Sequence, residues 1–265
     1  MSSVSNMSSM SSMSILPTMP PERIIDRNGR TPLPPYILHA RRERHDLPAH
    51  GDDDDRAWYE TVYADARRRG SIAAPTAGLH FTAELLDRLR QRGIGRIDVL
   101  LHVGAGTFKP IDAETLEAHT MHREWYEVSA EALEAIRAAR SAGHERAHAP
   151  PDARAAGMAS TGARDGSPGR IVAVGTTTCR TLESLPSPLP DPAAGAVAGE
   201  TGILIAPGHR FRHVDALMTN FHLPRSTLLA LVAALVGLEW LKEIYAEAIR
   251  SGYRFYSYGD AMLVL

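Results

Sequence analysis

Three short segments combine glycine and threonine with a histidine or an arginine where a predicted strand meets a loop or a helix. They are AAPTAGLHFT at residues 73–82, LHVGAGTFKP at 101–110 and AVGTTTCRTLE at 173–183. Glycine lets a ligand approach the backbone closely, and free amide groups at the start of a helix attract anions. In open α/β sheets, ligands collect at the carboxyl ends of the strands. The three segments together predict one pocket for a small molecule, although each taken alone is equally consistent with a tight turn.

A fourth segment, TNFHLPRSTLLALVAALVG, places polar residues directly before a long apolar run. A first-turn proline or a capping Ser226 would be enough to start the helix. Neither requires Asn220, His222 or Arg225. Next to the positive end of a helix, these three side chains add hydrogen-bond donors and a proton carrier, which suits an anionic or highly polar ligand. We therefore predict a ligand site here in addition to a helix cap.

The segment HTMHREWYE brings His119, His122 and Glu124 close together along the chain. These side chains could offer nitrogen and oxygen ligands to a metal. The spacing is not that of a metalloprotease, and no third ligand is fixed by it. Acid–base work or substrate binding by one histidine is the preferred interpretation, with the other histidine lying on the surface. We predict no metal.

The segment YRFYSYGDAM contains four aromatic residues together with Arg254 and Asp260. Such residues can stack on nucleic-acid bases and contact phosphates. The favoured interpretation is aromatic packing in the core beside a turn at Gly259. Cys179, the only cysteine, excludes a disulfide within the chain and is expected to be buried in a helix.

The composition is that of an ordinary globular protein. The 265 residues are 44% hydrophobic and 23% charged, and the net charge of −2 gives no overall basic field. The longest apolar run, 228–238, is too short to cross a bilayer, and the lone cysteine agrees with a reducing cytoplasm. Residues 1–30 predict a disordered leader, 141–169 a flexible insertion and 186–199 a linker within a domain over 31–265.

Caps and apolar periodicity predict helices that alternate with strands. Thr82 is a suitable N-cap for a helix that Gly93 would end, and Ser129 for the next helix. RIVAVGTTTCRTLES predicts a strand that passes through Gly175 into a helix. The other expected elements are an extended segment at 31–37, a helix around 58–68, strands in GRIDVLLHVGAG and at 201–208 and 211–220, helices after Ser226 and over 238–252, and a C-terminal strand. The fold class is α/β, a mixed sheet with flanking helices.

Eight blocks of the sequence resemble a known family in their order along the chain. They are PLPPYI, TVYA, GSIAAPTAGLHFT, LHVGAGTF, HTMHREWYEV, RIVAVGTTTCRTLES, PGHRFRHVDALMTNFHLPRSTLL and YRFYSYGDAM. The family is that of the S-adenosylmethionine:tRNA ribosyltransferase-isomerases of queuosine biosynthesis. The resemblance covers residues 31–265 apart from the insertion and the linker.

The resemblance implies a reaction. Family members transfer the ribosyl part of S-adenosylmethionine to 7-aminomethyl-7-deazaguanine at the wobble position of tRNA and rearrange it, which gives epoxyqueuosine and releases adenine and methionine. S-adenosylmethionine is consumed as a substrate, and no cofactor is expected. From the resemblance, we expect the family's front portion and inserted β-barrel domain to be absent. We also expect a monomer, with a separately encoded N-terminal half as a potential partner. The alternative is an inactive, truncated relative that binds only tRNA or a nucleoside.

The resemblance also adds weight to the candidate site residues. We expect His80, His102 and His222 to carry protons, with Glu124 and Asp260 as weaker candidates. The residues expected to hold the substrate are Thr76, Gly78, Gly104, Gly106, Thr107, Thr176, Thr177, Arg180, Asn220, Arg225 and Ser226.

Overall fold

The structure is a computed structural model of the chain. It describes residues 30–43, 52–65, 67–68, 71, 73–104, 121–147 and 169–265, with the side chains of 141–147 left out. The chain divides into two units, Met1–Thr31 and Pro32–Leu265, and the described residues lie almost wholly in the second. The expected leader therefore lies almost wholly outside the described residues.

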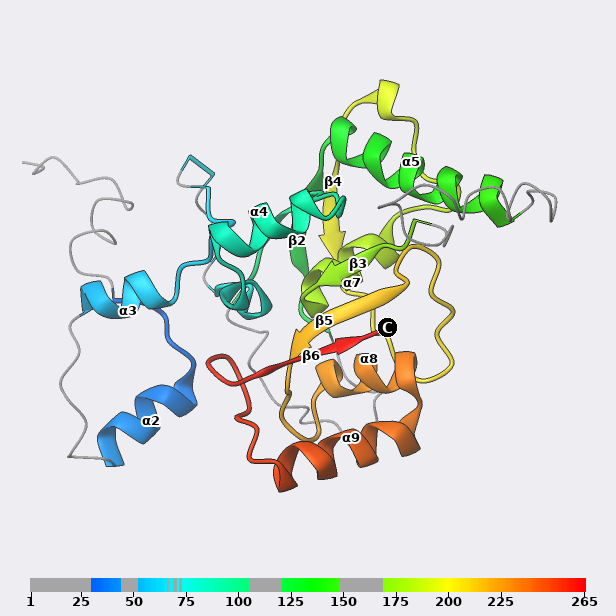
Figure 1. Cartoon of the computed structure of the whole chain (residues 1–265). Helices are drawn as coiled ribbons and strands as arrows, with labels where there is room; N and C mark the ends of the chain where they lie inside the picture. The colour runs from blue at the N-terminus through cyan, green and yellow to red at the C-terminus, as the bar shows by residue number, and fades with distance from the viewer. Residues whose placement is uncertain are drawn as a thin grey trace, which may run out of the picture. The chain divides into compact units, whose positions relative to one another are not determined.

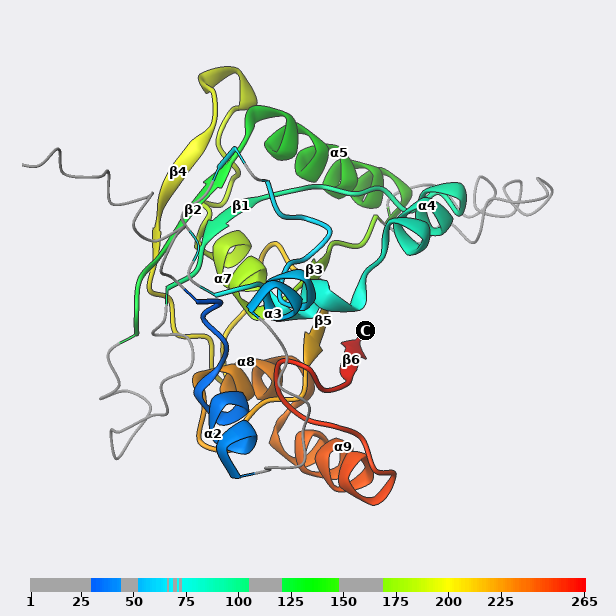
Figure 2. The ribbon, with the colours of Figure 1, turned by 90° about the vertical axis from the view of Figure 1, so that its left-hand side faces the viewer.

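Sheet A consists of three antiparallel strands, β1 (Leu100–His102), β2 (Glu124–Val128) and β4 (Val197–Thr201), in the order β1-β2-β4 (Figure 2). Residues of β2 alternate between buried and part-buried positions. One face of sheet A therefore packs on the core, and the other is partly open.

Sheet B consists of β3 (Val172–Val174), β5 (Ala216–Asn220) and β6 (Ala261–Val264), in the order β3-β5-β6. β3 and β5 are parallel, whereas β5 and β6 are antiparallel. The predicted class, α/β with a mixed sheet and flanking helices, is confirmed. The carboxyl ends of β3 and β5 share one edge of sheet B, which is where such folds hold ligands.

The helices surround and connect the two sheets (Figure 1). They are α2 (Pro35–Glu43), α3 (Asp52–Trp58), the 3-10 helix η1 (Thr76–His80), α4 (Ala83–Gln91), α5 (Ala130–Ala147), α7 (Thr176–Ser184), the 3-10 helix η4 (Pro192–Ala194), α8 (Thr227–Val236) and α9 (Leu238–Arg250). None of the described helices is long and apolar enough to cross a membrane.

Local signals placed several helix starts correctly. The hydroxyl oxygen of Thr82 accepts a hydrogen bond from the amide of Leu85 at 3.1 Å, and that of Ser129 from Ala132 at 3.2 Å. These are the N-caps that the sequence predicts, and each satisfies one amide that the helix itself leaves unpaired.

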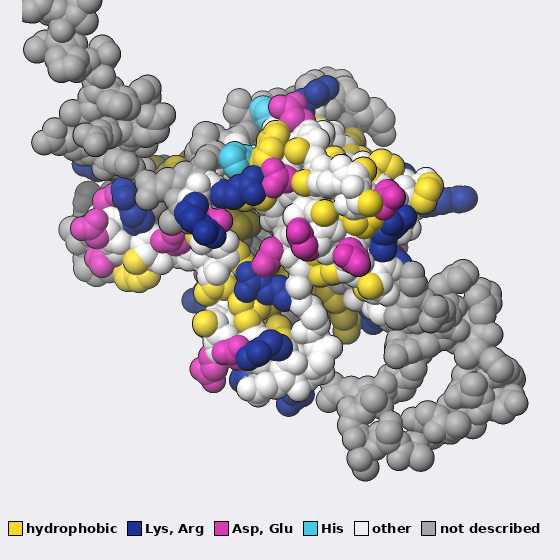
Figure 3. Space-filling view, turned by 90° about the horizontal axis from the view of Figure 1, so that it is seen from above, with side chains coloured by type: hydrophobic (Ala, Val, Ile, Leu, Met, Phe, Trp, Pro, Cys, Tyr) yellow, Lys and Arg dark blue, Asp and Glu magenta, His cyan; other side chains and the backbone are white. Residues whose placement is uncertain are grey.

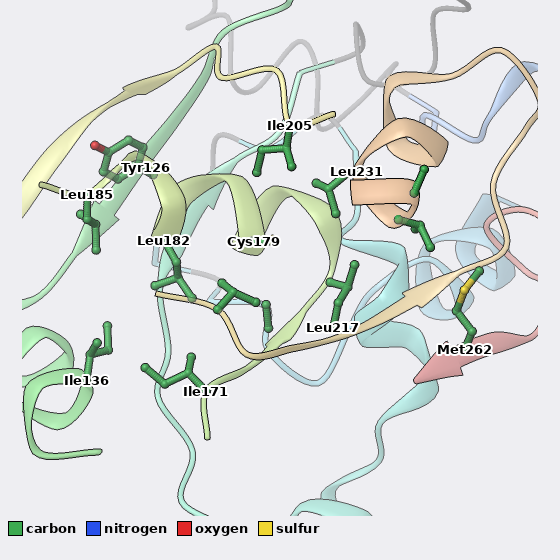
Figure 4. Close-up of a cluster of buried hydrophobic side chains, with 14 of the residues drawn as sticks. Tyr126, Ile136, Ile171, Cys179, Leu182, Leu185, Ile205, Leu217, Leu231 and Met262 are labelled. Carbon is green, nitrogen blue, oxygen red and sulfur yellow. The ribbon is translucent and has the colours of Figure 1, made fainter. Parts of the chain in front are cut away.

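The core gathers around α7, which contacts β3 and β5 of sheet B and also β4 of sheet A. Figure 4 shows Cys179 and Leu182 of α7 among side chains from both sheets, such as Tyr126 and Leu217. Cys179 is fully buried, as expected, and burial raises the pKa of its thiol to about 12. The thiol is therefore a packing group at neutral pH.

Two elements near the N-terminus differ from the prediction. Pro35 begins α2, within the segment expected to be extended. Proline restricts the residue before it, so the restriction ends at Pro34, and Pro35 itself suits the first position of a helix. In place of the helix expected around 58–68, α3 begins at Asp52 and ends at Trp58, and the four aspartates at 52–55 favour this helix start because they lie at its positive end.

Differences also occur around the expected strand at 201–208. The strand there is β4, which ends at Thr201, whereas buried Ile205 lies in an irregular segment. The apolar run therefore marks burial and not pairing. β4 and η4 occupy part of the expected linker, and α5 continues to Ala147, into the expected insertion.

Candidate functional site

Three chain segments meet at the carboxyl edge of sheet B. The amide of Gly175, which follows β3, donates to the carbonyl of Met218 in β5 at 2.8 Å. A Cβ on Gly175 would lie 3.7 Å from the Cβ of Ala77 in η1, and η1 also contacts β5. Segments 73–82 and 173–183 and the end of β5 are thus neighbours in space. The pocket that the sequence predicts also includes segment 101–110, of which residues 105–110 lie outside the described residues, so the shared pocket stays a prediction.

Asn220, the last residue of β5, is the centre of this site. Its side-chain Nδ2 lies 2.9 Å from Nε2 of His80, and its Oδ1 accepts a hydrogen bond from the Thr76 hydroxyl at 3.2 Å. Nδ2 also donates to the carbonyl oxygen of Ser257 at 3.5 Å. Asn220 is only 3% exposed, so its amide is committed to these partners and fixes the orientation of His80.

His80 has an unusually acidic imidazolium. Burial lowers its pKa below the ordinary value, and the negative charge of Asp260 offsets this only in part. Hydrogen bonds from the backbone and side chain of Arg254 lower the pKa of Asp260. At neutral pH, the site therefore combines a neutral imidazole with a nearby carboxylate, a pair that can take up and pass on a proton.

The first turn of α7 borders the same edge. Thr176 and Thr177 are buried there, and the N-cap, Gly175, has a φ of 92° and no capping side chain. Amides at the positive end of a helix suit an anionic group such as a carboxylate. Gly78 has a packing role, because a Cβ on it would come within 3.1 Å of Thr61 and Tyr63.

Comparison with known proteins identifies the family of the chain. A family model described as "Queuosine biosynthesis protein" matches residues 3–149 and 154–264. The chain belongs to this family.

Relatives within the queuosine biosynthesis family are longer than this chain. The chain is 51% identical over 236 residues to the S-adenosylmethionine:tRNA ribosyltransferase-isomerase of Bradyrhizobium sp. (strain BTAi1), with 89% of this chain and 55% of that protein covered. It is 47% identical over 240 residues to the protein of the same name from Geobacter metallireducens, with 91% and 59% covered. The chain thus spans little more than half the length of these curated relatives.

A solved structure is also similar. The S-adenosylmethionine tRNA ribosyltransferase of Thermotoga maritima is 40% identical in sequence and aligns with a TM-score of 0.49, over 71% of this chain and 51% of that chain.

In this member of the queuosine biosynthesis family, Arg180 and Glu124 form a buried ion pair. Arg180 Nη1 donates to Glu124 Oε2 at 2.8 Å, and the two side chains are 5% and 2% exposed. The other Arg180 nitrogens donate to the carbonyls of His122, Thr201 and Ile203. The pair joins α7 to sheet A, so the geometry gives no support to Glu124 as an acid or base, or to Arg180 as a substrate ligand.

His222 is held on the other side of β5 from Asn220. Its Nε2 lies 2.8 Å from the hydroxyl of Thr219, and its backbone amide donates to the hydroxyl of Tyr245 at 2.8 Å. Thr219 and Asn220 are consecutive in β5, so their side chains point to opposite faces. Burial lowers the pKa of His222 to about 4. The structure thus assigns His222 contacts between β5 and α9, and does not unite it with His80.

His102 lies on the open face of sheet A. Its ring packs at a tilt of 60° against that of Trp125, the residue opposite it in β2, with 4.7 Å between centroids. Its Nε2 is buried without a hydrogen-bond partner in the described part of the chain. Gly104 follows β1, whereas Gly106 and Thr107 lie outside the described residues. His102 thus contacts Trp125 within sheet A, and the site roles of His102, Gly104, Gly106 and Thr107 stay predictions.

Ser226 and Arg225, in the polar cluster before α8, have local structural roles. The Ser226 hydroxyl accepts from the amide of Leu229 at 3.2 Å and donates to the carbonyl of Leu223 at 2.7 Å, so it caps the helix. Arg225 is exposed and has a φ of 55°, in the left-handed region of a turn. Of the cluster, only Asn220 reaches His80.

Sequence reasoning gave no role to two residues that shape the site. Ser257 acts through its carbonyl oxygen, which no residue type reveals. Glu183 is fully buried, and its carboxylate accepts from the amides of residues 212–214 at 2.9 Å each. Burial favours a raised pKa for Glu183, but these hydrogen bonds lower it overall. Glu183 thereby fixes the loop that leads into β5.

Proposed function

We propose that this chain carries the catalytic edge of an S-adenosylmethionine:tRNA ribosyltransferase-isomerase. The reaction would transfer the ribosyl part of S-adenosylmethionine to 7-aminomethyl-7-deazaguanine at the tRNA wobble position and isomerise it to epoxyqueuosine. Adenine and methionine would be released. The observation that carries the proposal is the Asn220–His80 contact at the carboxyl edge of sheet B, in a chain half identical to proteins of that name.

The site suits two requirements of this chemistry. A proton beside the positively charged sulfur must be removed, and the neutral imidazole of His80 can accept one at Nε2 when that nitrogen is released from the hydrogen bond of Asn220. Asp260 would stabilise the imidazolium that results, because its negative charge raises the pKa of His80. The same imidazolium could then deliver a proton to the departing adenine. The first turn of α7 would hold an anionic substrate group.

The tRNA would need contacts beyond this edge. On the face seen in Figure 3, basic and acidic side chains of the described residues are interspersed, in agreement with a net charge of −2. A surface of this kind gives weak nonspecific attraction to phosphates. Recognition of tRNA would therefore depend on a few placed side chains or on a second polypeptide.

A direct test measures adenine release. The purified chain is incubated with S-adenosylmethionine and with tRNA that bears 7-aminomethyl-7-deazaguanine, and adenine is quantified by chromatography. The assay is repeated after adding a polypeptide that corresponds to the part of the Bradyrhizobium relative outside the match. Release in either case supports the proposal. Binding of tRNA or nucleoside without release in both would replace it by a binding-only function.

A further inference from the structure

The orientation of the Asn220 amide follows from its three neighbours. The Thr76 hydroxyl can either donate or accept, so it fits both orientations of the amide. The Ser257 carbonyl oxygen can only accept, and it lies 3.5 Å from Nδ2. In the reverse orientation, two acceptor oxygens would face each other in a buried place. Ser257 therefore requires the amide nitrogen on its own side.

The same amide nitrogen faces His80. Because Nδ2 donates, Nε2 of His80 at 2.9 Å must accept and cannot carry a proton. In a neutral imidazole, the proton then resides on Nδ1. The alternative tautomer would point an N–H at an N–H donor.

The Ser257 carbonyl is itself held in place. The backbone amide of Ser257 donates to the hydroxyl of Tyr36 in α2 at 2.8 Å, and Ser257 is 6% exposed. The preceding residue, Tyr256, has a φ of 74°, a costly conformation for a bulky side chain. The ring of Tyr256 packs on that of Tyr36 with 5.0 Å between centroids, and its amide donates to the carbonyl of Phe221 at 2.9 Å.

We propose that the buried carbonyl of Ser257, positioned by Tyr36, fixes the proton of His80 on Nδ1 through the amide of Asn220. Ser257, Tyr36 and Asn220 are positioning residues for His80. The fixed tautomer presents an N–H donor at Nδ1 and holds Nε2 as an acceptor until Asn220 moves away. The catalytic use of this tautomer rests on the function proposed above, whereas the tautomer itself does not.

The test reads the tautomer directly. The full chain is labelled with ¹⁵N-histidine, and long-range ¹H–¹⁵N spectra are recorded near neutral pH without substrate, with the His80 signals assigned from His80→Gln. We expect a protonated Nδ1 and an unprotonated Nε2 in the unmodified chain. A neutral His80 with its proton on Nε2 would overturn the proposal without any variant.

Two substitutions test the relay. Asn220→Asp offers only acceptor oxygens, so Nε2 should gain a proton. An Nε2 that stays unprotonated in this variant would overturn the role of Asn220. Tyr36→Phe removes only the hydroxyl that holds Ser257, so the Nε2 resonance should shift toward its protonated position. An unchanged resonance would overturn the role of Tyr36.

Tyr253→Phe is the matched control for Tyr36→Phe. Tyr253 lies in the loop that carries Ser257, is 49% exposed and packs on Phe221. Its hydroxyl makes no hydrogen bond within the described residues. The His80 spectrum should not change. The spectra need no substrate, so the two proposals can fail separately. The expected tautomer without adenine release would contradict only the proposed function. Adenine release with the proton on Nε2 would contradict only this inference.

Discussion

The side-chain nitrogen of Asn220 lies 2.9 Å from Nε2 of His80, although 140 residues separate the two along the chain. This contact joins the end of β5 to η1 and turns two separate sequence motifs into one site. It also identifies His80 as the histidine best placed to move a proton. The other two histidine candidates lie on different faces of the sheets.

Replacing His80 by glutamine should slow adenine release by about 10²–10⁴-fold, the usual contribution of a general acid or base. Glutamine keeps a polar side chain but cannot carry a proton. The control is His39→Gln, since His39 is a surface residue beside Glu43 in α2. Adenine release is followed by chromatography under saturating substrate. Equal rates in the two variants would remove His80 from the mechanism.

Asp260→Asn should lower the pKa of His80 further. The negative charge of Asp260 raises the pKa of His80, whereas burial lowers it. Without that charge, the lowering by burial is opposed less. In the unmodified protein, the backbone amide of Arg254 donates to Asp260 at 2.7 Å, and asparagine keeps a side-chain oxygen that can accept this hydrogen bond. The midpoint of the His80 titration, read from its ring resonances, should move to lower pH. Asp87→Asn, at an exposed position on α4, should leave that midpoint unchanged; a shift in the opposite direction for Asp260→Asn would contradict the electrostatic account.

Local signals in the sequence placed more of the fold than of the site. Helix starts at Thr82, Ser129 and Ser226 depend on residues a few positions away, so they were predictable. The strand order of the two sheets was not predictable, since strand pairing joins distant segments and an apolar run such as 201–208 indicates only burial. The grouping of the site residues was not predictable for a similar reason. Asn220 and His222 are two residues apart, a spacing that strand alternation would place on one face, but β5 ends at Asn220 and His222 instead contacts Thr219 on the opposite face.

Arg180→Leu should destabilise the protein by about 3–5 kcal/mol, because it leaves the buried carboxylate of Glu124 without this partner. The free energy of unfolding is measured in urea. Arg123→Gln is the control: Arg123 pairs with Glu200 at 3.5 Å on the surface, and its loss should cost about 0.5 kcal/mol or less. Similar losses in both variants would show that the buried pair is not structural and would reopen the predicted substrate role of Arg180.

Gly259→Ala should disturb the loop that carries Ser257. A Cβ at Gly259 would lie 2.4 Å from the carbonyl oxygen of Arg254 and 2.5 Å from the carbonyl carbon of Phe255, so the backbone must move. We expect a loss of about 1–3 kcal/mol in urea unfolding and altered His80 resonances. Gly95→Ala, where a Cβ meets nothing within 4 Å, should change neither. Unchanged stability in Gly259→Ala would mean that the loop is looser than its contacts indicate.

The stability of the protein should fall as the pH falls from about 6.5 to about 4, and His222 should account for much of this. Its pKa is about 4 in the folded chain, because burial disfavours the imidazolium, against an ordinary value of 6.5. In this window the unfolded chain takes up a proton that the folded chain does not, so acid favours unfolding, by about 2–3 kcal/mol at the lower end. Urea unfolding at several pH values should show a flatter dependence for His222→Gln than for the unmodified chain. Some dependence remains, since burial also lowers the pKa values of His80 and His213. The surface variant His39→Gln should keep the full slope, and an equally steep slope in His222→Gln would show that His222 is protonated as readily in the folded chain as in the unfolded one.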